Sequence, residues 1–394
     1  MWGFARAILD VLNKHFQESM SISISQSALI QATTYLGYFL MALPSGILIS
    51  KLGYRKGVVT GLLLFGLGSL LFIPAESTMS FNFFLGALFV IGCGLVILET
   101  AANPYASELG ERETAASRLN LAQSFNGLGC ILAPVLVGSF LFADGGGGKV
   151  AIPYSIMGAA VLLVALIFSK VKLPEITDTT NESEGEDEEE GEKISHIIRK
   201  LWRRKMFRVG IFALFAYEVS EISINSLFIN YATSDGWMDK STASLILSFG
   251  ALGLFMVARV VGSWVMSKIR AEKVLFICGV MTILGAIAVT FDAGWISRTG
   301  VFVCYAFEAI MFPTIFAITI AGVKPGKTIK IASSFLMMTP IGGAVGTLLM
   351  GAVADATSMS TAFIVPAAGY LCVFIYAALL GCKSTNRESN KIEN

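Results

Sequence analysis

Five carboxylic acids interrupt long apolar stretches of this sequence: Asp10, Glu99, Glu218, Glu221 and Glu308. A charged side chain at the centre of a membrane-spanning helix costs at least about 2.5 kcal/mol, so an acid in such a place is a functional candidate by default. An acid in a low-dielectric cavity can take up a proton from one side of a membrane and release it on the other. While neutral, it can also hydrogen-bond a polar ligand. Proton-linked binding of a polar solute is the chemistry that these residues predict.

Amide and tyrosine side chains lie at helical spacing from these acids or from one another. The groups are Glu99 with Asn103, Glu221 with Asn225, Gln31 with Tyr35 and Tyr38, and Asn120 with Gln123 and Asn126. Residues three or four apart share one face of a helix. Amides and carboxylates offer donors and acceptors together, which suits a polyhydroxylated ligand such as a sugar, and aromatic rings can cover its apolar face. The alternative is that the amides only hold helices together.

The composition indicates that these residues belong to a membrane protein. Of 394 residues, 55% are hydrophobic and 14% are charged, and the mean hydropathy is +0.70. Ordinary globular chains are about 45 to 50% apolar and about 25% charged. These values disfavour a soluble enzyme and predict an all-α membrane protein.

Eleven apolar segments are long enough to cross a bilayer, which takes roughly 20 residues per helix. They lie near residues 24–49, 57–75, 81–103, 118–142, 152–170, 207–232, 241–266, 274–291, 297–320, 331–353 and 361–381. The apolar stretch 1–12 spans only about 18 Å as a helix, which is too short for a core of about 30 Å. The sequence therefore predicts that the chain begins inside its first helix, which is truncated at its N-terminus.

The basic residues predict the orientation. Of the 29 Lys and Arg residues, 23 fall on one side of the predicted spans, four fall on the other, and Arg6 and Arg259 lie within helices. Cytoplasmic loops are rich in Lys and Arg, so both termini and the central loop are expected in the cytoplasm. We expect a cell membrane location, in a plasma or inner membrane.

The spans also suggest a domain organisation. Residues 1–170 and 207–382 are each predicted to form a six-helix bundle, and 383–394 a cytoplasmic tail. The linker 171–206 is acidic and then basic, with its basic part expected against anionic lipid headgroups. Two short matches suggest that the halves are repeats: Glu99 and Pro104 recur as Glu308 and Pro313, and Gly129 and Gly138 recur as Gly342 and Gly351. A pseudo-twofold axis would relate two such halves.

A small-residue loop between the second and third predicted helices carries a recognisable pattern, Gly46-x3-Ser50-Lys51-x-Gly53-x-Arg55-Lys56. Such a loop packs two helices closely, and its cations can contact the carboxyl ends of helices. The pattern resembles the signature loop of the major facilitator superfamily, which usually has Asp where this chain has Ser50. That resemblance implies twelve helices in two six-helix halves, with a substrate held at the midplane and exposed to each side in turn.

Longer motifs resemble one branch of that superfamily, the fucose permease or fucose:proton symporter family. They are Trp2-Gly-Phe-Ala-Arg-Ala-Ile-Leu-Asp10, Leu29-Ile-Gln-Ala-Thr-Thr-Tyr-Leu-Gly-Tyr38, Leu98-Glu-Thr-Ala-Ala-Asn-Pro104, Leu119-Asn-Leu-Ala-Gln-Ser-Phe-Asn126, Phe312-Pro-Thr-Ile-Phe316 and Ser333-Ser-Phe-Leu-Met-Met-Thr339. The resemblance covers nearly the whole chain. It implies import of a monosaccharide, L-fucose or one like it, coupled to a cation.

The same resemblance suggests roles for individual residues. It implies that Asp10 and Glu99 couple protons and bind sugar, and that Gln123 and Asn126 face the sugar. Glu221 falls where related sequences have Gln or Glu. We hypothesise that neutral Asp10 and Glu99 hydrogen-bond sugar hydroxyls and that their ionisation helps to release the sugar.

The roles of some residues do not follow from the resemblance. Glu218 and Glu308 lie outside the family pattern, and Tyr38 is a further candidate. Arg6 precedes Asp10 by four residues, a spacing at which an ion pair can form. Such a pair would keep Asp10 ionised and leave Glu99 as the main titrating site.

The sequence is also compatible with other functions. A sodium-coupled or passive glucose or galactose carrier is the main rival, and a non-transporting sugar sensor is the second. No enzyme, cofactor, metal or nucleic-acid partner is expected, because the chain has two histidines and shows no nucleophile–base arrangement. The cysteines are interpreted as small apolar residues, and the protein is expected to be a monomer in the lipid bilayer.

Overall fold

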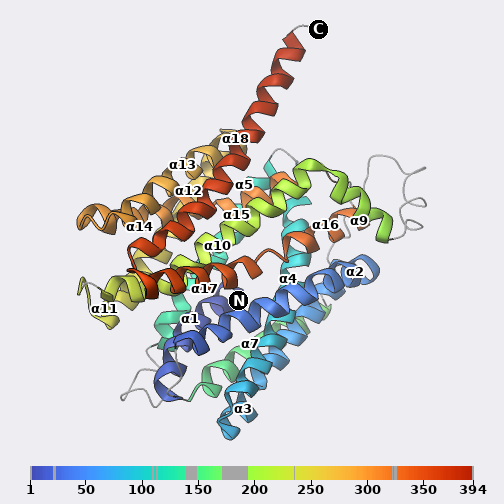
Figure 1. Cartoon of the computed structure of the whole chain (residues 1–394). Coiled ribbons are helices and arrows are strands. Elements are labelled where there is room, and N and C mark those ends of the chain that lie inside the picture. The colour runs from blue at the N-terminus through green and yellow to red at the C-terminus, as the bar shows by residue number, and fades with distance from the viewer. Residues whose placement is uncertain are drawn as a thin grey trace.

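The computed structural model describes residues 2–20, 24–108, 111, 114–138, 149–170, 194–234, 236–321, 323 and 326–392. Within these ranges, the side chains at 2, 10, 11, 13–15, 17, 18, 24–28, 108, 134, 138, 240, 241 and 381–392 lie outside the description. Residues 171–193 of the predicted linker 171–206 and the C-terminal residues 393 and 394 also lie outside it. Every element of the described ranges is a helix (Figure 1). The expected all-α fold class is therefore confirmed.

The first part of the chain supplies six predicted crossings. Its helices are α1 (Trp2–Ser19), α2 (Ile24–Leu70), α3 (Phe72–Thr78), α4 (Phe81–Glu108), α5 (Ala115–Ala133) with the π-helical turn η2 (Pro134–Gly138), and α7 (Ala151–Lys170). The apolar stretch Leu29–Thr78 is 50 residues long. At 1.5 Å per residue it measures about 75 Å, more than twice the thickness of a bilayer core. It therefore comprises two crossings, and the chain reverses direction between them.

The reversal lies at Gly53, whose φ of 80° falls where residues with a side chain are strained. Arg55, just beyond it, donates a hydrogen bond to the carbonyl oxygen of Ser169 near the end of α7. The small-residue loop thus joins two crossings and binds the carboxyl end of a third helix, as its sequence suggested. Ser50, which replaces the usual Asp, donates locally to the Ile47 carbonyl oxygen at 2.8 Å.

The second part of the chain begins with the short amphipathic helix α9 (Ile194–Arg203). Its crossings are α10 (Lys205–Ser234), α11 (Lys240–Leu245) with η4 (Ile246–Leu252) and α12 (Gly253–Met266), α13 (Ala271–Thr290), α14 (Trp295–Glu308) with α15 (Met311–Ile320), α16 (Lys327–Leu336) with α17 (Ile341–Ala356), and η5 (Thr361–Phe363) with α18 (Ile364–Ile392). Ten helical stretches of the described residues are long and apolar enough to cross a membrane. Two predicted single spans are broken, one before Pro313 and one at Pro340, because proline cannot donate its backbone nitrogen to a helix.

Each part packs mainly within itself. Helix α2 packs on α4 and α7, and α1 packs on α5, whereas α10 packs on α17 and α18, and α13 packs on α14 and α18. Gly129 and Gly342 let α5 and α17 approach α1 and α10, since an added Cβ would lie 2.9 Å from the Phe4 nitrogen and 2.6 Å from the Phe215 oxygen. Two helices of the first part contact the second part. Helix α5 packs on α12 and α15, and helix α2 packs on α16 and α17.

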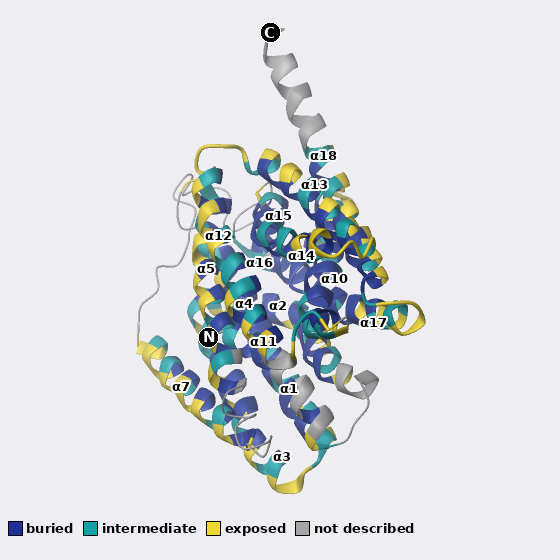
Figure 2. Cartoon of the chain, turned by 90° about the vertical axis from the view of Figure 1, so that its left-hand side faces the viewer, coloured by how far each residue is buried: buried dark blue, intermediate teal, exposed yellow. Residues whose placement is uncertain are grey.

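Apolar side chains cover the outside as well as the core. Phe125 and Trp295 are each 75% exposed, and Ile156 is 69% exposed. Figure 2 shows such exposed positions along the outer helices around a buried centre. Large exposed apolar surfaces of this kind fit contact with lipid rather than water.

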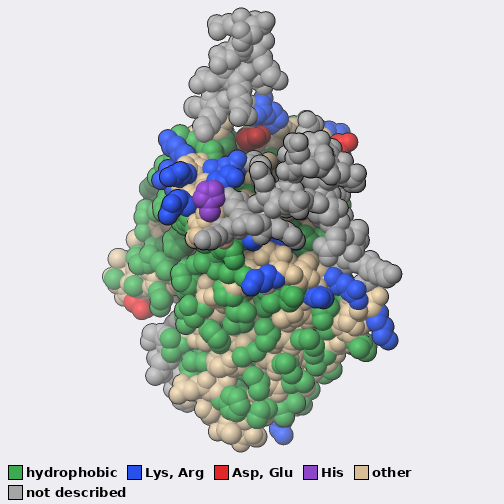
Figure 3. Space-filling model, turned by 90° about the vertical axis from the view of Figure 1, so that its right-hand side faces the viewer, with side chains coloured by type: hydrophobic (Ala, Val, Ile, Leu, Met, Phe, Trp, Pro, Cys, Tyr) green, Lys and Arg blue, Asp and Glu red, His purple; other side chains and the backbone are tan. Residues whose placement is uncertain are grey.

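Exposed cations gather at one end of the bundle (Figure 3). Lys51 and Lys56 flank the α2 reversal, and Arg199, Lys200 and Arg203 lie on α9. We call this the basic end. It is the end predicted to be cytoplasmic, because the loop at the α2 reversal and the central linker lie on the side that carries most of the Lys and Arg residues.

Candidate functional site

Six ionisable side chains gather in the centre of the bundle, where the first and second parts of the chain meet. They are Arg6 on α1, Glu99 on α4, Glu218 and Glu221 on α10, Arg259 on α12 and Glu308 at the end of α14. All four carboxyl groups are at most 5% exposed, and Glu308 is fully buried. Four acids and two cations therefore share one low-dielectric region, where each charge needs a partner.

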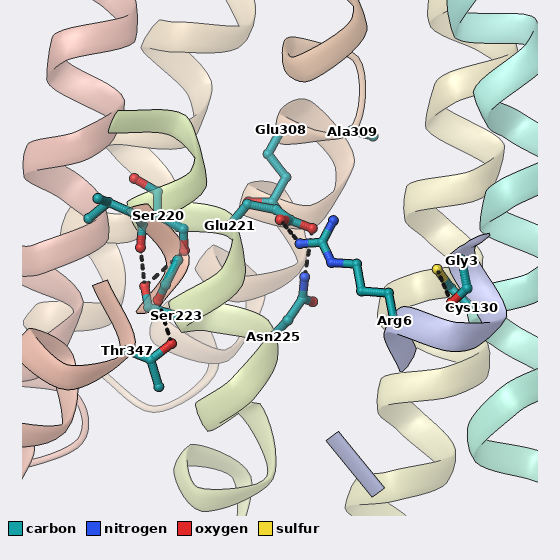
Figure 4. A network of polar contacts seen from close by, with 12 residues as sticks. Gly3, Arg6, Cys130, Ser220, Glu221, Ser223, Asn225, Glu308, Ala309 and Thr347 are labelled. Carbon is teal, nitrogen blue, oxygen red and sulfur yellow. Dashed lines mark hydrogen bonds and ion pairs between the residues drawn. The ribbon is translucent and has the colours of Figure 1, made fainter. Parts of the chain in front are cut away.

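Arg6 and Glu221 form an ion pair that joins α1 to α10. The second oxygen of Glu221 accepts a hydrogen bond of 2.8 Å from the Asn225 Nδ2 atom. Figure 4 shows the Arg6 side chain extending from α1 toward Glu221 and Asn225, with Glu308 beside them. The sequence had suggested Asp10 as the partner of Arg6. The structure gives Arg6 a partner 215 residues away, and the Asp10 side chain lies outside the described part.

Arg259 is held in place by backbone groups. Its Nε donates to the Ala309 carbonyl oxygen at 2.7 Å and its Nη1 to the Gln123 carbonyl oxygen at 3.1 Å. Its guanidinium lies 4.5 Å from the centre of the Phe255 ring. Pro313, four residues after Ala309, has no N–H to give to that carbonyl, so the proline creates the acceptor that Arg259 uses. Sequence reasoning missed this site residue, although an arginine inside an apolar segment was a visible signal.

The Glu99 carboxyl group lines a small cavity, and Arg6 of the Arg6–Glu221 ion pair lines the same cavity. The Tyr38 hydroxyl hydrogen-bonds this carboxyl group, and Oε1 has no hydrogen-bond partner among the described residues. We call this space the Glu99 cavity. Its lining comprises Arg6, Tyr35, Tyr38, Glu99, Gln123, Tyr217, Glu218, Arg259, Phe312 and Pro340. The predicted candidates Glu99, Gln123, Tyr38 and Glu218 thus share one space.

A second small cavity lies on the Glu221 side of the ion pair, and we call it the Glu221 cavity. Its polar lining comprises Arg6, Gln31, Tyr35, Asn126, Cys130, Glu221, Asn225, Ser226 and Arg259. Arg6, Tyr35 and Arg259 line both cavities. The two spaces are therefore separated by these three side chains.

A chain of amides supports the cavities from behind. Asn126 donates to the Gln123 side-chain oxygen, and Gln123 donates to the Asn103 side-chain oxygen at 2.8 Å. Asn103 lies beyond both cavities, and its own amide nitrogen is 3.7 Å from the sulfur of Met337. Asn103 was predicted to bind substrate. In the structure Asn103 lines neither cavity and holds the Gln123 amide, so its contact with substrate stays a prediction.

Two other predicted residues also lie outside the cavities. Asn120 is fully buried and donates to the Ala116 carbonyl oxygen at 2.9 Å and to the Thr314 hydroxyl at 3.3 Å, so it joins α5 to α15. Glu308 accepts a hydrogen bond from the Tyr370 hydroxyl. Helical spacing identified Asn120, and its place in an apolar segment identified Glu308, but neither signal could tell a cavity wall from a contact between helices.

Direct contacts between the two parts of the chain lie between the cavities and the basic end. Ser117 and Ser263 each donate to the carbonyl oxygen of the other, at 2.9 and 2.8 Å. The Lys330 ammonium lies 4.7 Å from the centre of the Tyr54 ring. These contacts close the bundle toward the basic end.

A helical membrane bundle with a buried polar site where two sets of helices meet is typical of secondary transporters. The chain belongs to the Major Facilitator Superfamily, whose sequence profile matches residues 1–327. It is 33% identical to the L-fucose-proton symporter of Escherichia coli (strain K12) over 411 residues, covering 98% of this chain and 92% of that protein. It is 34% identical to the glucose/galactose transporter of Brucella abortus (strain 2308) over 394 residues, with the same coverage of 98% and 92%.

Solved structures agree with this assignment. The crystal structure of the transporter FucP in the outward conformation matches with a TM-score of 0.81 and 33% identity, over 96% of this chain and 95% of that one. The proton:xylose symporter XylE matches with a TM-score of 0.72 at 12% identity, over 95% and 92%, which shows the fold alone. The major facilitator fold and the resemblance to the fucose permease branch are thereby confirmed.

Proposed function

We propose that this protein is a secondary active transporter that imports a monosaccharide together with protons by alternating access. Glu99 carries the proposal: a buried acid in a cavity shared with Gln123, Tyr35 and Tyr38, with one carboxyl oxygen that has no described partner. Such an oxygen can accept a sugar hydroxyl, while the amides supply further donors and acceptors. Relatives described as L-fucose-proton symporter and glucose/galactose transporter support a monosaccharide as the solute.

The proposed transport cycle moves two halves against each other. Residues 1–170 and 207–382 are the proposed halves, with the central acids and amides at their interface. In this structure the contacts at Ser117 and Ser263 close the basic end, so the state corresponds to one closed toward the proposed cytoplasm. Breaking those contacts would expose the cavities to that side. We propose a cell membrane location with both termini at the basic end.

Each site residue has a proposed role in that cycle. Glu99, Gln123, Asn126, Gln31, Tyr35 and Asn225 line the cavities and are proposed sugar contacts. Asn103 is a positioning residue for Gln123, and Asn120 holds α5 against α15. Asp10 remains a candidate for proton coupling on the resemblance alone.

The proposed coupling follows from the cost of buried charge. An ionised carboxylate without a partner is expensive in this region, whereas a neutral carboxyl group can both donate and accept hydrogen bonds. A proton on Glu99 would therefore favour sugar binding, and sugar would favour the protonated acid. Loss of the proton on the opposite side would weaken both interactions and release the sugar.

A second candidate function is a glucose or galactose carrier that is sodium-coupled or passive. The 34% identity to a glucose/galactose transporter extends over nearly the whole chain and favours this candidate. The two candidates share the same cavity, because hydroxyl stereochemistry is read by small differences in geometry. They differ in the sugar that competes best and in the ion that drives accumulation.

Uptake into proteoliposomes tests these proposals. Purified protein should accumulate one or more labelled monosaccharides against a gradient at an external pH of 5.5 but much less at 7.5, with and without sodium. Glu99→Gln should bind sugar but lose accumulation, whereas Glu272→Gln, a partly exposed acid on α13, should behave as the wild type. Accumulation by Glu99→Gln would refute the coupling role of Glu99. A sodium requirement without a pH effect would favour the second candidate, and sugar binding without uptake would indicate a sensor.

A further inference from the structure

The Arg6–Glu221 ion pair occupies the space that a bound sugar would need. The Glu99 cavity measures about 20 Å³ and the Glu221 cavity about 30 Å³. Each has room for about one or two water molecules, and a monosaccharide is several times larger than a water molecule. The polar groups proposed to bind sugar are divided between the two cavities. A sugar that contacts both groups must therefore pass through the partition formed by Arg6, Tyr35 and Arg259.

Arg6 is the part of that partition best able to move. Arg259 is bound to two backbone carbonyl oxygens on different helices and lies over the Phe255 ring. The Arg6 side chain is 21% exposed and pairs with the Glu221 carboxylate, which is 4% exposed. A long, flexible guanidinium side chain can exchange one carboxylate partner for another without any movement of the backbone.

Carboxyl groups that could receive Arg6 lie on the other side of the partition. Arg6 lines the same cavity as Glu99 and Glu218, and its charge acts on both. Moving Arg6 from Glu221 toward these acids would keep the guanidinium compensated. It would also leave the Glu221 carboxylate and the Asn225 amide facing a larger, continuous space.

We propose that the Arg6–Glu221 pair is a gate inside the binding site: it holds α1 against α10 and keeps the two cavities apart, and an entering sugar replaces it. The sugar hydroxyls would then donate to Glu221, and Arg6 would turn toward Glu99 and Glu218. The identity of the ligand as a monosaccharide rests on the proposed function, but the gate itself rests on the ion pair and the two cavities.

Cys130 offers a reporter at the site. It lines the Glu221 cavity and donates to the Gly3 carbonyl oxygen at 3.3 Å. A variant that keeps Cys130 and replaces the other cysteines with alanine would allow the alkylation of one thiol to be followed with N-ethylmaleimide in the purified protein. Two variants remove the gate: the single variant Arg6→Ala, and the double variant that combines Arg6→Ala with Glu221→Gln. We expect both to raise the alkylation rate about tenfold over the single-cysteine parent.

Controls separate a gate from a general loosening of the fold. Glu272→Gln removes a partly exposed acid that lines neither cavity, so the Cys130 rate should stay within about twofold of the parent. Arg6→Lys keeps the charge but loses the planar fork, and its rate should fall between those of the parent and Arg6→Ala. If Arg6→Ala fails to fold, the double variant still provides the test, because it leaves no unpaired Glu221 charge. Parent-like rates in the folded variants would overturn the proposal.

Sugar binding tests the displacement step. If the sugar replaces the pair, Arg6→Ala should bind it about threefold to tenfold more tightly, since no pair has to be broken. Weaker binding would show that Arg6 is itself a sugar contact and would overturn the displacement. If no monosaccharide is bound or taken up while Arg6→Ala still exposes Cys130, the proposed function fails and the gate stands. If sugar is transported while Arg6→Ala leaves the alkylation rate of Cys130 unchanged, the gate fails and the proposed function stands.

Discussion

The contact between Arg259 and the proline break of α14 and α15 makes a quantitative prediction. Arg259→Lys keeps the positive charge but cannot reach the Ala309 and Gln123 carbonyl oxygens together, so it should lose one charge-assisted hydrogen bond. Such a bond is worth about 1.5 to 3 kcal/mol, and its loss leaves a buried carbonyl unsatisfied. We expect a destabilisation of about 2 kcal/mol. That corresponds to a fall of about 2 to 4 °C in the thermal unfolding midpoint of the purified protein.

The proline supplies a way to check the cause. In Pro313→Ala the new backbone N–H can bond the Ala309 carbonyl, so that acceptor no longer depends on Arg259. Arg259→Lys should then cost about 1 kcal/mol less than it does in the wild type, as a double-mutant cycle would show. Pro44→Ala is the matched control, since Pro44 lies at an exposed position within α2. Equal costs of Arg259→Lys in all three backgrounds would refute this account.

Three further outcomes are expected. Asn103→Ala should raise the sugar KM about fivefold with little change in thermal midpoint, because Gln123 loses its 2.8 Å partner; an unchanged KM in uptake assays would contradict the positioning role. Tyr370→Phe removes the donor to buried Glu308 and should lower the midpoint by several degrees, measured by the same unfolding assay; no shift would mean that Glu308 has another sufficient partner. Replacing the cations of 199–205 by glutamine should abolish any thermal stabilisation by anionic over zwitterionic phospholipid, and stabilisation that survives would place the lipid contact elsewhere.

Local sequence was enough to predict most of the helices. Hydropathy and the length of a bilayer crossing predicted eleven apolar segments whose described residues lie mainly on helices, and Gly53 marked the reversal inside α2. The breaks before Pro313 and at Pro340 could also have been predicted, because proline affects only its own neighbourhood. The halves 1–170 and 207–382 remain a prediction from weak repeats.

Site residues were predictable by type rather than by partner. The acids and amides at helical spacing do lie inside the bundle, and Glu99, Gln123 and Asn126 line its cavities. Asn103 and Asn120 have the same chemistry and similar spacing, yet one supports a neighbour and the other joins two helices. The difference of a few ångströms between these positions is set by how helices pack.

The sequence by itself determined that this protein crosses a membrane many times, where its cations gather, and which polar side chains are retained among apolar ones. Those properties are sums over neighbouring residues, and the lipid environment acts on each stretch separately. Only the tertiary structure decided that Arg6 pairs with Glu221, 215 residues away, and that Arg259 uses a carbonyl freed by Pro313. Electrostatic and hydrogen-bond partners depend on distances between helices that are far apart in the chain, and packing alone fixes those distances.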